Sequence, residues 1–137
     1  MSIGLRHQEL FSKIGGHMPA IDLSYADEDE CYFTDEAMWL KNDPITIAKQ
    51  TTFDDLQVFL DDGKEDEGQF YRACEKLFQL LQQNGADVQS HLFEGNHSGD
   101  YTALKALDSK DVIFEFPPVK EKGLWERRIL LFSAHSR

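Results

Sequence analysis

Two short segments of the sequence end in side chains that could transfer protons. The first, Leu56–Leu60, is an apolar, β-rich run followed by an acidic turn that includes Asp66. The second, Asp87–Phe93, is followed by His97. A carboxylate that accepts the Nδ1 proton of an imidazole fixes its tautomer and turns Nε2 toward a nucleophile. A carboxylate of this turn, from Asp61, Asp62, Glu65 or Asp66, and the imidazole of His97 are therefore candidates for the acid and the base of a hydrolase.

The elements around these residues must bring them together. Between the two runs, Gln69–Asn84 carries apolar residues at three- and four-residue spacing, and Gly85 follows where a helix C-cap glycine belongs. The order strand, helix, strand predicts a βαβ unit and hence a parallel sheet. In open α/β sheets, functional groups gather beyond the carboxyl ends of the strands. Neighbouring strands lie about 4.8 Å apart, so an Asp–His hydrogen bond is within reach.

Shorter patterns predict the remaining elements. They are a short helix that includes Ile3 to Phe11 and ends before Gly15-Gly16, a strand over Phe11–Met18, a helical turn with Thr34 as N-cap, a helix over Tyr101–Leu107, and strands over Val112–Phe116 and Ile129–Phe132. The tail from residue 105 onward holds seven Lys or Arg against five Asp or Glu and does not continue the βα rhythm. We therefore expect an organised part over 1–104 and a divergent tail over 105–137.

Composition limits the class of protein. The 137 residues are 41% hydrophobic and 12% aromatic, which is typical of one globular domain. A net charge of −11 argues against nucleic acid and anionic membranes, because both need clustered basic residues. No stretch approaches the ~20 apolar residues of a membrane span, and no signal peptide is seen. Cys31 and Cys74 form no C-x-x-C motif, which favours free thiols and a cytoplasmic protein.

Metal chemistry is disfavoured by ligand spacing. The turn from Asp62 to Gly68 superficially resembles a calcium loop, but Lys64 occupies the third ligand position and the sixth lacks glycine. His91, Glu94 and His97 could ligate zinc, yet His91 falls within a predicted strand. We predict neither a metal nor a cofactor. The other histidines, His7, His17 and His135, are assigned to surface or turn positions without an inferred partner.

Several blocks of the sequence resemble, in order, one family of α/β-hydrolases. The segments Leu5–Gly16, Asp43-Pro44, Val58–Asp66, Phe70–Asn84 and Phe93–Ser98 resemble motifs of the esterases related to esterase D and to the enterochelin and feruloyl esterases. The resemblance covers about Ile3 to Leu104. It implies that the acid of a catalytic triad is Asp66, with Asp62 as the fallback, that its base is His97, and that the substrate is a small carboxylic ester.

The family's nucleophile motif is missing. Such enzymes carry serine in G-x-S-x-G, on a tight turn, and the sequence contains no such motif. Ser2 lacks flanking glycines, and the family pattern would put the elbow before Met1. The expected fold is therefore α/β: a partial α/β-hydrolase, the C-terminal strands of a parallel sheet with flanking helices, its N-terminal half missing.

Three functions follow as hypotheses. The first is a serine-esterase fragment that supplies Asp66 and His97 without the nucleophile. The second is an inactive remnant or an interaction module that forms a homo-oligomer or pairs with a complementing N-terminal half, since an incomplete sheet exposes a strand edge. The third is a flavodoxin-like or receiver-like domain whose acidic cluster holds magnesium.

Overall fold

A computed structural model describes residues 1–21, 35–66, 68–96 and 128–133. Its elements follow in the order α1 (Ser2–Arg6), β1 (Phe11–His17), α2 (Glu36–Asn42), α3 (Pro44–Gln50), β2 (Gln57–Gly63), α4 (Phe70–Gln83), β3 (Asp87–Phe93) and β4 (Arg128–Ser133). None of the helices in these ranges is long and apolar enough to cross a bilayer.

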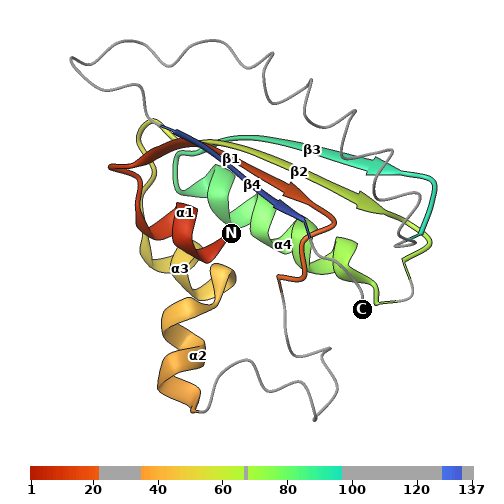
Figure 1. Cartoon of the computed structure of the whole chain (residues 1–137), viewed down its shortest axis with the longest axis horizontal. Helices are drawn as coiled ribbons and strands as arrows, with labels where there is room; N and C mark the ends of the chain where they lie inside the picture. Colours follow the sequence, from red (N-terminus) through yellow and green to blue (C-terminus); the bar gives the residue numbers. More distant parts are fainter. Residues whose placement is uncertain (22–34, 67, 97–127, 134–137) are drawn as a thin grey trace.

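The strands form one parallel sheet in the order β3-β2-β1-β4 (Figure 1). The predicted α/β arrangement is thereby confirmed in its coarse form, a parallel sheet with flanking helices. The βαβ unit is present as β2, α4 and β3, and β2 and β3 are neighbours over their full length, from Gln57 opposite Asp87 to Gly63 opposite Phe93. The predicted strand over Ile129–Phe132 lies within β4, which pairs with β1.

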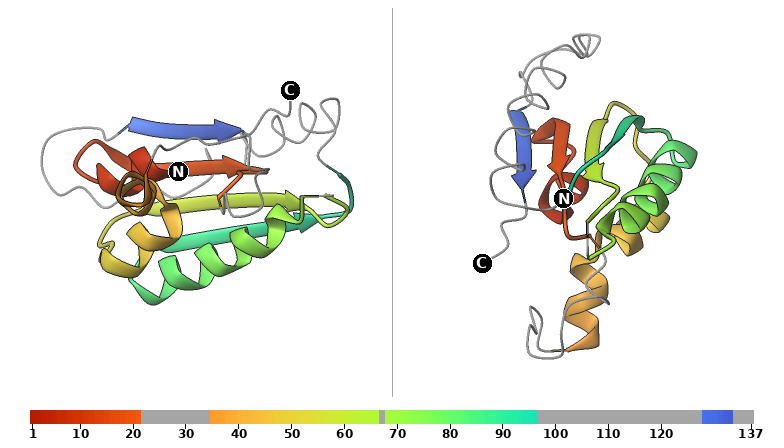
Figure 2. Two further views of the ribbon diagram at one scale, coloured as in Figure 1. Left: turned by 90° about the horizontal axis from the view of Figure 1, so that it is seen from below. Right: turned by 90° about the vertical axis from the view of Figure 1, so that its right-hand side faces the viewer.

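The described helices gather on one face of the sheet (Figures 1 and 2). Side chains alternate between the faces of a strand, so Ile14 of β1 and Val58 and Leu60 of β2 share the helix-covered face. They form one buried core with Leu77 and Leu81 of α4. The alternate residues of these two strands, including His17 of β1 and Asp61 of β2, belong to the opposite face.

The C-terminal end of helix α4 is the one that the sequence predicts. Its C-terminal side reaches Asn84 and then Gly85, whose φ is +97°. A Cβ at Gly85 would stand 2.7 Å from the carbonyl oxygen of Phe53, so both the left-handed backbone and the close approach require glycine there. At the other end, Gln69 has φ 52° and its side chain does not cap the helix.

Two local expectations differ from the structure. The first helix ends at Arg6 and does not reach Phe11, which begins β1. Gly15 and Gly16 lie inside that strand and do not end a helix. The N-cap of α2 is Asp35, which accepts a hydrogen bond from the Met38 N–H at 2.7 Å, and not Thr34, which lies outside the described residues.

Helix α3 was not predicted as a helix. Asp43 caps it by accepting from the N–H groups of Ile45 and Thr46, and Pro44 occupies its first turn, where a missing N–H costs nothing. The Asp-Pro pair was a usable start signal. The predicted elements over Tyr101–Leu107 and Val112–Phe116 lie outside the described residues.

Candidate functional site

Buried polar side chains gather at the carboxyl ends of β1 and β2. Asp61 and Asp62 are each 2% exposed, Asp66 is 5% exposed, and His17 is 6% exposed. Isolated buried charges are costly, so each of these groups requires polar partners. These side chains do not all lie on one face of the sheet, because the consecutive residues Asp61 and Asp62 of β2 point to opposite faces.

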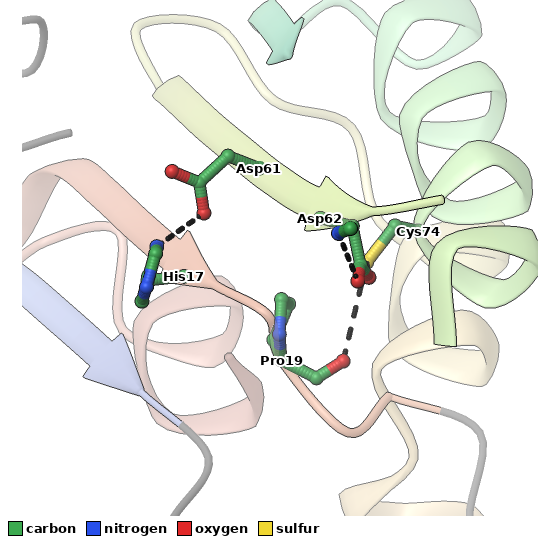
Figure 3. A network of polar contacts seen from close by, with 6 residues as sticks. His17, Pro19, Asp61, Asp62 and Cys74 are labelled. Atoms are coloured by element: carbon green, nitrogen blue, oxygen red, sulfur yellow. Dashed lines mark hydrogen bonds and ion pairs between the residues drawn. The ribbon is translucent and has the colours of Figure 1, made fainter. Parts of the chain in front are cut away.

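His17 and Asp61 form a buried pair across two strands (Figure 3). The two residues are opposite each other in the β1–β2 register, and His17 Nδ1 lies 2.6 Å from Asp61 Oδ1. The backbone adds a further link, since the Met18 N–H donates to the Asp61 carbonyl at 2.8 Å. Assigning His17 to a surface or turn position without a partner was therefore wrong. The signal that could have found it is its place at the end of the predicted strand Phe11–Met18.

Asp62 faces the helices and meets Cys74 of α4. The Cys74 thiol donates to Asp62 Oδ2 at 3.2 Å, and Asp62 Oδ1 accepts from the Gly63 N–H at 2.9 Å. Burial raises the pKa of Cys74 well above its usual value, and the nearby charge of Asp62 raises it further. A neutral, buried thiol is a poor nucleophile, so Cys74 serves as a donor and a packing group in this position.

Asp66 is held in the turn between β2 and α4. Its Oδ1 accepts from the Gly68 N–H at 2.9 Å, its own N–H donates to the Gly63 carbonyl at 3.3 Å, and its carbonyl accepts from the Gln69 N–H at 3.0 Å. The side chain is thus buried and its backbone fixed on both sides. A carboxylate held this way keeps one position relative to the end of β2.

The turn after β2 is joined to the segment that follows β3. Lys64 N–H donates to the Phe93 carbonyl at 3.0 Å, and Glu65 N–H donates to the Gly95 carbonyl at 2.9 Å. A Cβ at Gly63 would stand 2.3 Å from the Gly95 oxygen, so the two backbones touch. The Lys64 ammonium also pairs with Glu94. The backbone that carries Asp66 is therefore bonded to Gly95, two residues before His97.

His97 itself lies outside the described residues, so the structure places only one member of the predicted pair. Of the hypothetical zinc ligands, His91 is exposed in β3 and Glu94 is engaged with Lys64. Within the described ranges, no three His, Cys, Asp or Glu side chains are grouped so that they could hold a metal ion.

Comparisons with models of protein families, with curated protein sequences and with solved structures found no match.

Proposed function

We propose that this chain supplies the acid and the histidine of a serine-type carboxylic-ester hydrolase, with Asp66 orienting His97. The nucleophile is not part of the proposal for this chain, because the sequence has no G-x-S-x-G motif. The fold would then be the C-terminal part of an α/β-hydrolase. The substrate would be a small carboxylic ester, and the reaction an acyl transfer in which His97 moves the proton.

One observation carries the proposal: the Asp66 turn is hydrogen-bonded to the segment that leads into His97. Glu65 N–H donates to Gly95, and β2 and β3 are parallel neighbours up to Gly63 and Phe93. In sequence, Asp66 follows the carboxyl end of β2 and His97 follows the carboxyl end of β3. The loops beyond these strand ends are where α/β proteins place their sites.

Burial supports assigning different roles to the two Asp–His pairs. A triad acid is buried and acts through its histidine, which fits Asp66 at 5% exposure. The base, in contrast, must reach both nucleophile and substrate. His17 is 6% exposed and already paired with Asp61, so we assign that pair to the stability of the sheet. Cys74, as a buried free thiol, fits a reducing compartment such as the cytoplasm.

The alternative is an inactive remnant or an interaction module that needs a partner chain. It is favoured by the missing nucleophile motif, since a base without a nucleophile has nothing to activate. Both functions predict little ester hydrolysis by the chain alone. The discriminating property is therefore the Asp66–His97 hydrogen bond and not turnover.

Histidine nitrogen NMR of the full chain tests this bond directly. If Asp66 accepts from His97, neutral His97 is held as the Nδ1–H tautomer, and Asp66→Asn shifts its ring nitrogens toward the ordinary tautomer mixture. Asp62→Asn is the matched control and leaves His97 unchanged. The His17 signals, which respond only to Asp61→Asn, confirm that each variant is folded.

Two results would reject the proposal. One is a His97 ring already in the free tautomer mixture and insensitive to Asp66→Asn. The other is a response to Asp62→Asn alone, which would transfer the acid role to the fallback residue. As a second readout, hydrolysis of p-nitrophenyl acetate that is abolished by His97→Ala in the isolated chain would mean that a nucleophile exists within these residues.

A further inference from the structure

Strand β3 is one of the two edge strands of the described sheet, the other being β4. It is hydrogen-bonded to β2 on one side only, and no other strand of the described sheet lies beyond it (Figures 1 and 2). Its side chains are mostly exposed; Leu92, at 44%, is among the most exposed large apolar residues of the described part. An edge strand presents unpaired N–H and C=O groups that can pair with another strand.

The usual protections against such pairing are missing from β3. Asp87–Phe93 contains no Pro, Lys or Gly, and its register with β2 runs without a bulge. Natural edge strands commonly carry lysine, proline or a bulge to prevent association. Apart from Asp87 at one end, its only charged residue, the strand also lacks the acidic side chains that are frequent elsewhere in the chain. Within the described residues, β3 therefore carries none of these three protections, in a chain that is otherwise strongly anionic.

The sequence of β3 complements itself when two copies run antiparallel. With Ser90 opposite Ser90, Val88 lies opposite Leu92, Gln89 opposite His91, and Asp87 opposite Phe93. No like charges face each other, and each apolar residue of the helix-covered face meets another. Directly opposite pairs of this kind are the units that stabilise antiparallel sheets.

The faces also match in this arrangement. Val88, Ser90 and Leu92 are opposite Val58, Leu60 and Asp62 of β2, so they belong to the helix-covered face. Gln89 and His91 belong to the other face. Pairing residues of the same parity keeps the helices of both copies on one side of a continuous sheet, as a two-fold axis perpendicular to the sheet requires.

We propose that β3 is a homodimerisation edge, with two copies of this chain joining antiparallel in a register centred on Ser90. The contact through β3 is isologous and closed, so pairing through this edge stops at the dimer. Because each copy carries a charge of −11, the repulsion between copies opposes pairing, and added salt strengthens the dimer by screening it. The inference stands apart from the proposed function, since neither Asp66 nor His97 is part of the edge.

Cysteine crosslinking of the full chain tests the register. In the Cys31→Ser background, Ser90→Cys places two thiols directly opposite, where antiparallel Cα atoms lie about 4.5–5.5 Å apart, within disulfide range. Mild oxidation then gives a disulfide-linked dimer. Gln89→Cys is the matched control, because in this register it faces His91 and not itself. Cys74 is buried and should not contribute.

Analytical ultracentrifugation tests the energetics. Leu92→Lys should raise the dimer dissociation constant at least tenfold, whereas Met38→Lys, which changes a residue of equal 44% exposure on α2, should leave it unchanged. A wild-type chain that stays monomeric up to millimolar concentration at high salt would overturn the proposal. So would open-ended polymers, or crosslinking through Gln89→Cys in place of Ser90→Cys.

Discussion

The backbone of Gly63 lies against the carbonyl of Gly95 so closely that a Cβ added at Gly63 would stand 2.3 Å from the Gly95 oxygen. This contact joins the turn after β2 to the segment after β3. Both partners are backbone, so neither can move aside as a flexible side chain could. Glycine at the last position of β2 is therefore required for the geometry of the candidate site.

Gly63→Ala should consequently loosen the site and destabilise the fold. Overpacking costs about 1–3 kcal/mol in well-packed regions, and we expect the upper part of that range, measured by urea unfolding. Gly68→Ala is the matched control in the same turn. The three atoms nearest to its Cβ would belong to the side-chain ring of Phe70, which can shift more easily than backbone, so a smaller loss is expected. Equal losses in the two variants would contradict the backbone contact.

The His17–Asp61 pair predicts strong energetic coupling. Asp61→Leu or His17→Phe alone leaves the other buried polar side chain without its partner in this pair, which costs about 1–3 kcal/mol. The double variant should lose less than the sum of the single losses, because neither orphan remains. Urea unfolding of the four proteins measures the coupling, and Asp54→Asn, at an exposed position, is the neutral control. Additive losses would show that the two side chains do not interact.

The Cys74 thiol should react slowly in the native state. Burial and the charge of Asp62 raise its pKa, so little thiolate is present at neutral pH, and Cys74 is only 3% exposed. In the Cys31→Ser background, labelling with a disulfide reagent should be at least about a hundredfold slower than for a free thiol, and urea should restore the ordinary rate. Asp62→Asn should leave native labelling slow, because burial is the larger cause. Fast native labelling would contradict the packing of Cys74 against Asp62.

The sequence pattern was sufficient for the elements with strong local signals. The β-rich run before Asp61, the helical spacing before Gly85 and the run Asp87–Phe93 each predicted an element that the structure contains. Their order alone predicted that β2 and β3 are parallel, since a helix connects them. Placing Asp66 beside the segment before His97 followed from the same reasoning.

The partner of His17 could not be found in the same way. His17 follows two glycines, which weaken a strand prediction, and Asp61 lies 44 residues further along the chain. Only the β1–β2 register places them opposite each other, and register depends on tertiary packing. Helix α3 was missed for a different reason. The Asp43-Pro44 start signal is local, but it was interpreted only as a family motif.

The amino group of Met1 predicts a pH dependence of stability. Met1 is 8% exposed, and burial lowers the pKa of its α-amino group from 8.0 to about 5. Between these values the unfolded chain binds a proton that the folded chain does not, so the unfolding free energy should rise as pH increases from 5 to 8 and level off above 8. Three pKa units correspond to at most about 4 kcal/mol. Urea unfolding at several pH values, on protein whose Met1 is verified by mass spectrometry, measures the slope. Acetylation of the amine removes the titrating group, so that slope should become shallower, whereas an unchanged slope would show that the Met1 amine is not its cause.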